Sequence, residues 1–257
     1  MRRLLRVVGA RPLRPVPCGI SAYAEDLIPR LGREIDLTVL YDGFTPDSDF
    51  SDWPVTLCPA AQLPALYARL PQDLLVSHMG NNPHHEWIWR LMQRWRGLVV
   101  LHDTNFSQFL PGHYLNTNQP GRLLAALLEH HGEAGHALGR EMLAKAGTPA
   151  WEAFAPRMFE CSMTGPILDR ALRAVVHSAH AAAAVRCVSP SPVDEVPMNF
   201  VPEGGYLPRG SVRPSRFNLP DEVPLILSLG FVAPHTRLDR GVAPRGPRRA
   251  PGRVVRV

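Results

Sequence analysis

A histidine and an aspartate directly follow a short apolar run in the first half of the chain. Residues 98–101 read Leu-Val-Val-Leu behind a glycine, and the next two residues are His102 and Asp103. A continuous apolar run of this length is typical of a buried strand in a parallel sheet. Ligands of open α/β sheets bind beyond the carboxyl ends of the strands, and imidazole exchanges protons near neutral pH. His102 is therefore a candidate catalytic residue, although a histidine that merely ends a strand would leave the same pattern.

The preceding apolar run, residues 74–77, also ends in polar residues. It continues into His78 and then into the sequence Met-Gly-Asn-Asn-Pro. Loops that leave the carboxyl ends of parallel strands deliver the polar groups that contact ligands. We therefore count Asn81, Asn82 and Asp103 as candidate substrate-binding or donor-binding residues.

A glycine marks the start of the first predicted helix. An apolar run at 4–9 is followed by a proline-rich loop at 11–17, and Gly19 then opens a segment with apolar residues at helical spacing from Ile20 to Leu31. Such a loop presents free backbone N–H groups and the positive end of the helix dipole to a phosphate. Gly19 and Ile20 are therefore candidate phosphate-binding residues, but a single glycine is a weak signal and simple turn formation explains it equally well.

Neither the histidines nor the cysteines of the sequence show the spacing of metal ligands. His84 and His85 are adjacent and so point in different directions on a helix, while His130, His131 and His136 lack a carboxylate and a histidine at ligand spacing. We expect His130, His131 and His136 to be surface histidines. We predict no metal site. The cysteines are far apart and form no CxxC pair, which fits a reducing cytosol: they are Cys18, Cys58, Cys161 and Cys187.

The net charge of the chain comes from its last residues. The formal charge is +5, but residues 240–257 hold six arginines and no acid, so residues 1–239 carry 5 − 6 = −1. This distribution gives no reason to propose a nucleic-acid partner. The first residues contain too few apolar side chains for a signal-peptide core, and no run is long enough to span a membrane. We expect a cytoplasmic protein without an integral membrane segment, and peripheral contact with a membrane stays open.

Short apolar runs alternate with segments of helical periodicity along the chain. The runs predict strands at 4–9, 35–41, 55–58, 74–77, 98–101, 174–178 and 193–196. The segments between them predict helices at 20–31, 63–70, from 83, through much of 104–173, and at 179–188. This alternation predicts an α/β fold in which a Rossmann-like parallel sheet carries helices on both faces.

The composition changes after residue 199. Residues 200–222 are rich in glycine, proline and arginine and are typical of an interdomain linker. Residues 223–239 contain one apolar run and a loop, as at the start of a second domain, whereas residues 240–257 form an Arg/Pro/Gly tail without apolar periodicity. We therefore predict a first domain at 1–199, a second domain that is essentially missing, and a disordered tail.

The motifs at the strand ends, taken in order, resemble a known family over about residues 3–239. The chain resembles the amino-terminal half of a GT-B glycosyltransferase of the family-4 type, which is retaining and uses a nucleotide-sugar. The segments that carry this resemblance are Pro17-Cys-Gly-Ile-Ser-Ala-Tyr, Gly80-Asn-Asn-Pro-His-His-Glu, Val99-Val-Leu-His-Asp, Val175-Val-His-Ser-Ala-His and Leu227-Ser-Leu-Gly-Phe-Val-Ala-Pro-His-Thr-Arg-Leu-Asp.

This resemblance implies two facing Rossmann-like domains, of which the first binds mainly the acceptor and the second the nucleotide-sugar donor. It implies that Gly19 lies near the donor phosphates and that His102 lies beside the transferred sugar, with no metal required. Thr236 stands where the family usually has a lysine, and the neighbouring Arg237 remains as a donor-binding candidate. The Glu-x7-Glu motif of the family's second domain has no true counterpart.

The resemblance therefore implies transfer of a sugar from a nucleotide-sugar to an acceptor that the sequence does not identify. Because most donor contacts are missing, we expect a truncated enzyme and no measurable transfer by this chain alone. One alternative is a non-enzymatic carbohydrate-binding or scaffold module that uses only the first domain. Another is an ordinary Rossmann enzyme that depends on a nucleotide or nicotinamide, but no GxGxxG follows the run at 4–9.

Overall fold

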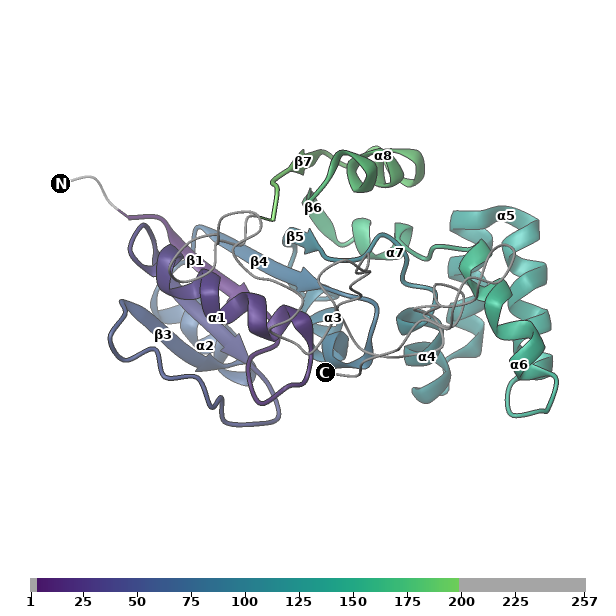
Figure 1. Cartoon of the computed structure of the whole chain (residues 1–257), viewed down its shortest axis with the longest axis horizontal. Coiled ribbons are helices and arrows are strands. Elements are labelled where there is room, and N and C mark those ends of the chain that lie inside the picture. The colour runs from purple at the N-terminus through teal and green to yellow at the C-terminus, as the bar shows by residue number, and fades with distance from the viewer. Residues whose placement is uncertain (1–3, 199–257) are drawn as a thin grey trace, which may run out of the picture. The chain divides into compact units, whose positions relative to one another are not determined.

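The computed structural model describes residues 4–198, and these form a seven-stranded parallel sheet surrounded by helices (Figure 1). The strand order is β3-β2-β1-β4-β5-β6-β7. This confirms the predicted Rossmann-like α/β architecture. The strands are β1 (Arg6–Ala10), β2 (Asp36–Tyr41), β3 (Val55–Pro59), β4 (Leu74–Met79), β5 (Gly97–Leu101), β6 (Ala171–Val176) and β7 (Val193–Glu195).

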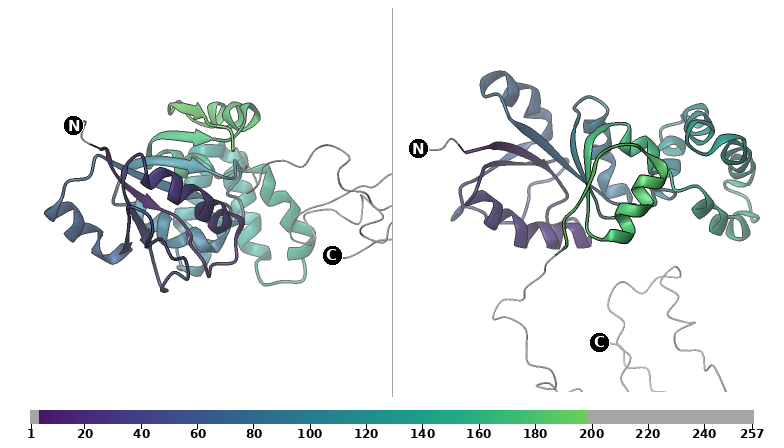
Figure 2. Two further views of the ribbon diagram at one scale, coloured as in Figure 1. Left: turned by 60° about the vertical axis from the view of Figure 1, so that its left-hand side comes forward. Right: turned by 90° about the horizontal axis from the view of Figure 1, so that it is seen from above.

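The helices connect successive strands and cover the sheet, with α1 and α2 on opposite faces (Figure 2). None of the helices within 4–198 is both long enough and apolar enough to cross a bilayer. The α-helices are α1 (Gly19–Gly32), α2 (Leu63–Arg69), α3 (Glu86–Met92), α4 (Phe109–Asn116), α5 (Pro120–Lys145), α6 (Trp151–Phe154), α7 (Gly165–Leu168) and α8 (Ala179–Val188). Three 3₁₀ turns are η1 (Ala60–Gln62), η2 (Pro83–His85) and η3 (Ala155–Glu160).

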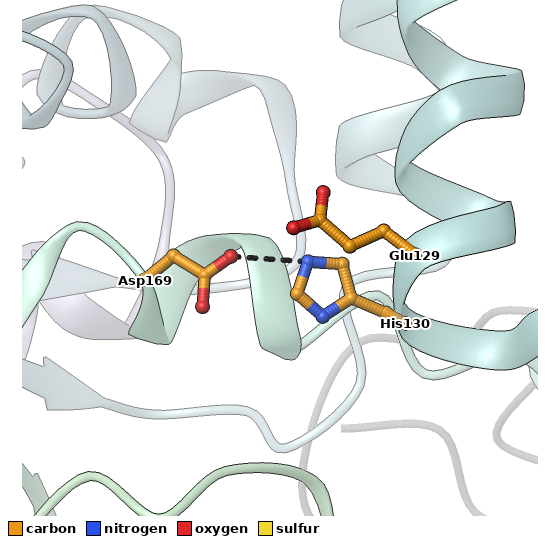
Figure 3. Close-up of side chains that lie close together, drawn as sticks. All are labelled: Glu129, His130 and Asp169. Atoms are coloured by element: carbon orange, nitrogen blue, oxygen red, sulfur yellow. Dashed lines mark ion pairs between the residues drawn. The ribbon is translucent and has the colours of Figure 1, made fainter.

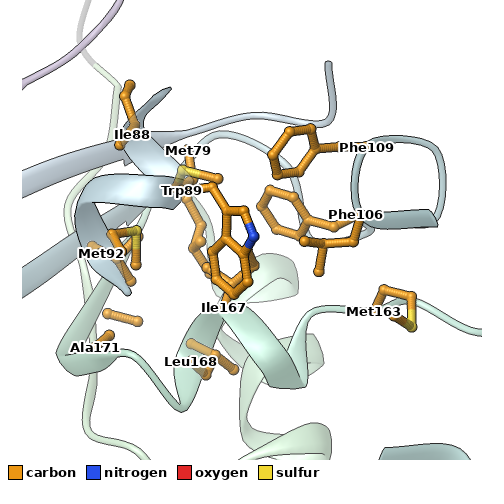
Figure 4. Close-up of a cluster of buried hydrophobic side chains, with 14 of the residues drawn as sticks. Met79, Ile88, Trp89, Met92, Phe106, Phe109, Met163, Ile167, Leu168 and Ala171 are labelled. Carbon is orange, nitrogen blue, oxygen red and sulfur yellow. The ribbon is translucent and has the colours of Figure 1, made fainter. Parts of the chain in front are cut away.

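Two apolar clusters lie on opposite faces of the sheet, because successive side chains of a strand point to opposite sides. In β1, Val8 and Ala10 belong to the larger cluster and Val7 belongs to the smaller one, beneath α1. The larger cluster continues under α3 and α7, where Trp89 lies among Met79, Phe106 and Ile167 (Figure 4). The sequence builds this core with the apolar runs that it uses for its strands.

Strands are added on both sides of β1, which lies inside the sheet. From β1 the chain moves outward through β2 to β3, and it then returns to place β4 on the other side of β1. The crossover from β1 to β2 and the crossover from β3 to β4 lie on opposite faces of the sheet. The loops after β1 and β4 therefore diverge. Such a switch point is where open α/β sheets bind their ligands.

Residues 102–170 between β5 and β6 hold several helices, in agreement with the helical pattern of this segment. The helices α4, α5 and α6 gather to the right of the strands in Figure 1, past the end toward which the arrow of β4 points. Two details differ from the expectation. The strand predicted at 174–178 begins at Ala171 and ends at Val176, and α5 is kinked at Gly132, where φ is 62°.

A close backbone approach explains the glycine that opens β5. A Cβ atom added to Gly97 would overlap the carbonyl oxygen of Leu75 in β4. The pairing of β5 with β6 also shifts register between Gly97 and Leu98. A glycine at this position lets the backbone of β5 approach that of β4. The two strands can then run side by side until β5 ends before His102.

Grouping by contacts separates residues 1–199 from residues 200–257. The predicted linker at 200–222, the start of a second domain at 223–239 and the tail at 240–257 lie outside the described residues. Arg237, a donor-binding candidate, lies outside them as well. These predictions therefore stay predictions.

Candidate functional site

Four neighbouring strands each bring one nitrogen-bearing side chain to the carboxyl edge of the sheet. Arg11 follows β1, His78 is the penultimate residue of β4, His102 follows β5 and His177 follows β6. These strands are adjacent in the order β1-β4-β5-β6. The backbone N–H of His102 donates to the carbonyl oxygen of Met79 at 2.9 Å, which continues the ladder between β4 and β5 to this edge.

His102 contacts both of the other imidazoles, and a tyrosine from α1 lies against all three. Nδ1 of His78 is 3.0 Å from Nε2 of His102, so one of these nitrogens donates a hydrogen bond to the other. The ring centroids of His102 and His177 are 5.0 Å apart. The ring of Tyr23 lies 5.5 Å from that of His102, 6.0 Å from that of His177 and 6.4 Å from that of His78. We call these four residues the histidine cluster.

A buried arginine accompanies the histidine cluster. Arg11 is only 2 % exposed, and its Nε and Nη1 have no hydrogen-bond partner among the described residues. Burial lowers the pKa of Arg11 to about 10, which still leaves the guanidinium charged at neutral pH. A buried charge without a counter-ion is strongly unfavourable, because its desolvation is not compensated. The environment of Arg11 therefore favours an anion beside it.

The imidazoles of His78 and His102 are neutral at physiological pH. Burial, followed by repulsion from His177, His85 and Arg11, lowers the pKa of His102 to about 3. Burial and the same kind of repulsion, from Arg11 first, hold the pKa of His78 well below 6.5. Burial also raises the pKa of Tyr23, which keeps its phenol protonated. The site therefore combines one fixed positive charge with neutral hydrogen-bonding groups.

His102 keeps one ring nitrogen available to a ligand. Its Nε2 faces His78, while its Nδ1 makes no hydrogen bond with any residue in the part of the chain described. The side chain is half-buried, so this nitrogen is not sealed in the core. A neutral imidazole in this position can donate to or accept from a hydroxyl group.

The predicted phosphate-binding turn lies at the start of α1. The side chain of Cys18 caps this helix by accepting from the backbone N–H of Ser21, and a Cβ atom added to Gly19 would meet nothing within 4 Å. Gly19 therefore faces open space, so close packing does not explain it. Tyr23, four residues later in α1, contacts His102. The structure thus brings the first turns of α1 to the histidine cluster.

The loop after β4 packs tightly against α1. A Cβ atom added to Gly80 would lie 2.8 Å from Cδ1 of Ile20, 2.9 Å from Cε1 of His85 and 3.3 Å from Oδ2 of Asp103. Ile20 and Asp103, both candidate binding residues, therefore meet at Gly80. Ile20 is buried, so its side chain contributes packing to this edge of the sheet.

The polar groups of the other candidates have partners within the protein. The carboxylate of Asp103 accepts from the backbone N–H of Asn81 at 2.7 Å. The Asn81 Oδ1 accepts from the N–H groups of Gln108 and Phe109 at the start of α4, and the Asn82 Oδ1 accepts from the N–H of His84 at 3.0 Å. These residues hold the loops around His102 in place, which is a positioning role in this structure.

Sequence reasoning named only one member of the arrangement at the sheet edge. It missed Arg11, His78, His177 and Tyr23 as site residues. The available signal was the one used for His102, because Arg11, His78 and His177 each stand at or just after the end of an apolar strand. Tyr23 was hidden, since its position in the pattern of α1 is that of a core residue.

One cluster of possible metal ligands lies away from this site. Nε2 of His130 is 3.1 Å from Oδ2 of Asp169, and Glu129 completes a group whose ligand atoms lie within 4.8 Å of one another (Figure 3). An imidazole and two carboxylates are ligands that Zn²⁺ accepts. Both carboxylates are exposed, however, and the ion pair alone accounts for the arrangement. His130 is also half-buried, unlike the expected surface histidine, and its ring packs against Gly165.

The comparisons with protein-family models, with curated proteins and with solved structures found no match for this chain.

Proposed function

We propose that the described domain forms the acceptor-side half of a glycosyl-transfer site that uses a nucleotide-sugar, with His102 beside the transferred sugar. The observation that carries this proposal is the buried charge of Arg11, which has no counter-ion among residues 4–198, next to the neutral imidazoles of His78 and His102 at the switch point of a Rossmann-like sheet. This combination suits a ligand with an anionic part and a hydroxyl-rich part. A nucleotide-sugar has both, in its diphosphate and its sugar ring.

Glycosyl transfer needs a group that binds the anionic diphosphate and groups that bind the sugar hydroxyls in one site. Transfer breaks the bond between the anomeric carbon and a diphosphate oxygen, and the departing diphosphate takes the electron pair. A new bond forms to the acceptor oxygen, whose proton passes to an oxygen of the departing diphosphate. Fixed positive charge stabilises the leaving diphosphate, and in a site without bulk water this is the larger part of catalysis. Arg11 supplies that charge, and the N–H groups at the start of α1 add to it.

The neutral histidines orient the sugar. With its Nε2 engaged by His78, His102 presents Nδ1 to a sugar hydroxyl. The edge of the Tyr23 ring closes the same space from α1. The low pKa of His102 makes it a hydrogen-bonding residue at neutral pH and a poor base. We therefore assign it the positioning of the sugar beside the reacting carbon.

Binding by the full chain tests this proposal. We expect calorimetry to detect UDP- or GDP-sugars, with the free nucleoside diphosphate bound through the same site. His102→Ala is expected to weaken binding of the nucleotide-sugar while leaving that of the nucleoside diphosphate unchanged, because His102 contacts only the sugar. His180→Ala, at an exposed position on α8, is the matched control and should change neither affinity.

Two outcomes would contradict the proposal. One is the absence of binding by every nucleotide-sugar at millimolar concentration. The other is binding of a nicotinamide dinucleotide in their place, which would indicate an ordinary Rossmann enzyme. Binding of free sugars without nucleotide-sugars would favour the alternative of a carbohydrate-binding module.

A further inference from the structure

A recess lies between α2, α3 and the turn from α4 to α5. Its volume is about 550 Å³. This lies within the range of cavities that hold small ligands. None of the residues that line it belongs to the histidine cluster, and Arg11 does not line it either. The side chains that matter for its chemistry are Trp87, Arg90, Gln93, Arg94, Trp95 and Arg122.

Two tryptophans give this cavity flat apolar walls. Trp87 and Trp95 are half-buried, so each keeps part of its ring system accessible. Trp95 is held in place by Tyr67, whose ring lies 4.8 Å away at an angle of 31°. An indole held in this way offers a surface on which a sugar or nucleobase can stack.

The charged groups of the cavity are mostly positive. Arg90 is 3.7 Å from Asp42, the one acidic residue of the lining. The guanidinium of Arg94 makes no ion pair or hydrogen bond with any residue between 4 and 198, and the guanidinium of Arg122 donates only to the neutral Oε1 of Gln119, at 2.9 Å. Arg90 also lies 4.0 Å from Glu86, so among the described residues the guanidinium groups of the cavity without a carboxylate partner are those of Arg94 and Arg122.

An unpaired amide points to the same kind of ligand. Nε2 of Gln93 is buried and has no acceptor in the described part of the protein. A buried donor without an acceptor is unfavourable. A ligand that brings an oxygen to this nitrogen would relieve that cost. The oxygen of an anion held by Arg94 and Arg122 is such an acceptor.

We propose that this cavity binds a ring that carries a phosphate monoester, such as a nucleoside monophosphate or a sugar phosphate. The ring stacks on Trp87 or Trp95, Arg94 and Arg122 bind the phosphate, and Gln93 donates to one of its oxygens. Arginine suits this role because its planar fork matches the geometry of phosphate. This site is separate from the histidine cluster and does not rest on the proposed glycosyl transfer.

Fluorescence and calorimetry on the full chain test the assignment. The probes are UMP, AMP and glucose 6-phosphate, each compared with its unphosphorylated counterpart and with inorganic phosphate. We expect the phosphorylated rings to change tryptophan emission and to bind at least about tenfold more tightly than either half alone. Whichever of the nucleotides and the sugar phosphate binds more tightly then identifies the kind of ring.

Matched variants locate the binding. Arg94→Gln combined with Arg122→Gln is expected to weaken binding by about tenfold or more, because two charged hydrogen-bond donors are lost. Arg140→Gln, at an exposed position on α5 outside the cavity, should leave the affinity unchanged. Trp87→Phe combined with Trp95→Phe should remove most of the emission change. These are replacements of exposed or half-buried side chains, and thermal melts verify that each variant is folded.

Three results would overturn the proposal. They are the absence of binding by any phosphorylated ring at millimolar concentration, equal binding of the unphosphorylated rings, and loss of binding in Arg11→Met instead of in the double arginine variant. The last would place the ligand at the histidine cluster. It would leave the test of the nucleotide-sugar proposal unaffected, because that test measures other ligands.

Discussion

At the scale of single residues, Arg11 has an unusual position, because the fold buries its charge and supplies no counter-ion from the described residues. Such a residue lowers the stability of the unliganded protein. Arg11→Met keeps the length of the side chain and removes the charge. We expect it to raise the free energy of unfolding by about 1–3 kcal/mol and to abolish binding of nucleoside diphosphates.

Urea denaturation and calorimetry measure both effects of Arg11→Met. The control is Arg140→Met, on the exposed face of α5, which we expect to change stability by less than about 0.5 kcal/mol. A loss of stability in Arg11→Met would show that the guanidinium has a partner that stabilises the fold.

His85 makes the stability of the protein depend on acid. Its Nδ1 is 3.1 Å from the Asn82 Oδ1, and its Nε2 is buried without a partner among the described residues. Burial lowers the pKa of His85 to about 4, with a smaller contribution from repulsion by His84, against an ordinary value of 6.5. Between pH 6.5 and pH 4 the imidazole of His85 is protonated in the unfolded chain but not in the folded protein. Stability is therefore complete above pH 6.5 and declines as the pH falls toward 4.

Urea denaturation at pH 7, 5.5 and 4 measures this decline. His85→Gln keeps a donor for Asn82 and does not titrate, so we expect it to reduce the loss between pH 7 and 4 by on the order of 3 kcal/mol. Part of the decline should persist, because His78 and His102 are shifted in the same direction. His180→Gln on α8 should keep the full decline, and an equal decline in His85→Gln would contradict the assignment.

His102 could be predicted from the sequence because a strand end can be located from its apolar run. Arg11 could not be singled out, since an arginine in a proline-rich loop is normally exposed, and only the folded loop shows that it is buried. The contact between His130 and Asp169 was equally hidden, because it joins residues 39 positions apart through the packing of α5 on α7.

At the scale of elements, the junction between β4 and β5 depends on a glycine. Gly97→Ala would force a Cβ atom onto the carbonyl oxygen of Leu75, a backbone atom that cannot rotate away. We expect a loss of about 1–3 kcal/mol in the free energy of unfolding. Gly112→Ala is the matched control, because a Cβ atom there meets nothing within 4 Å. Alanine in the interior of α4 should be neutral or stabilise by up to about 1 kcal/mol.

Thermal melts of Gly97→Ala and Gly112→Ala measure this difference in stability. Equal effects at the two positions would mean that β5 can move away from β4 at little cost. In that case the register shift beside Gly97 would have no structural role.

The strands were predictable as elements because each is a short apolar run, whereas their order in the sheet was not predicted from the sequence. The kink of α5 was not predictable in the same way. Its helical periodicity continues across residue 132, and a glycine inside a helix does not by itself reveal a φ of 62°. The start of β6 was also misplaced, because Ala171 and Leu172 extend the preceding helical pattern.

At the scale of the whole molecule, the described residues contain a complete sheet and both apolar clusters. We therefore expect residues 1–199 to fold without residues 200–257. The melting temperature of the shorter protein should lie within about 4 °C of that of the full chain, and its solubility should be higher. A strongly lowered melting temperature would show that the later residues belong to the first domain.

Catalysis by the full chain is a separate question at this scale. We expect no transfer by this chain alone, because Thr236 stands where the resemblance to GT-B glycosyltransferases implies a lysine, and the neighbouring Arg237 is not equivalent to it. Release of nucleoside diphosphate in the presence of varied acceptors measures this. Turnover that is lost in His102→Ala would contradict the expectation while supporting the role of His102.

The order of strands also governs how the protein is made. Val7 of β1 pairs with Leu74 of β4, 67 positions later, and Leu98 of β5 pairs with Arg173 of β6 after another long crossover. A chain emerging from the ribosome must therefore keep one edge of β1 unpaired until β4 has been synthesised. Pairings this distant make folding slow and leave apolar edges open to other chains. Production of the protein should accordingly depend on chaperones and on the rate of translation through the β1–β4 segment.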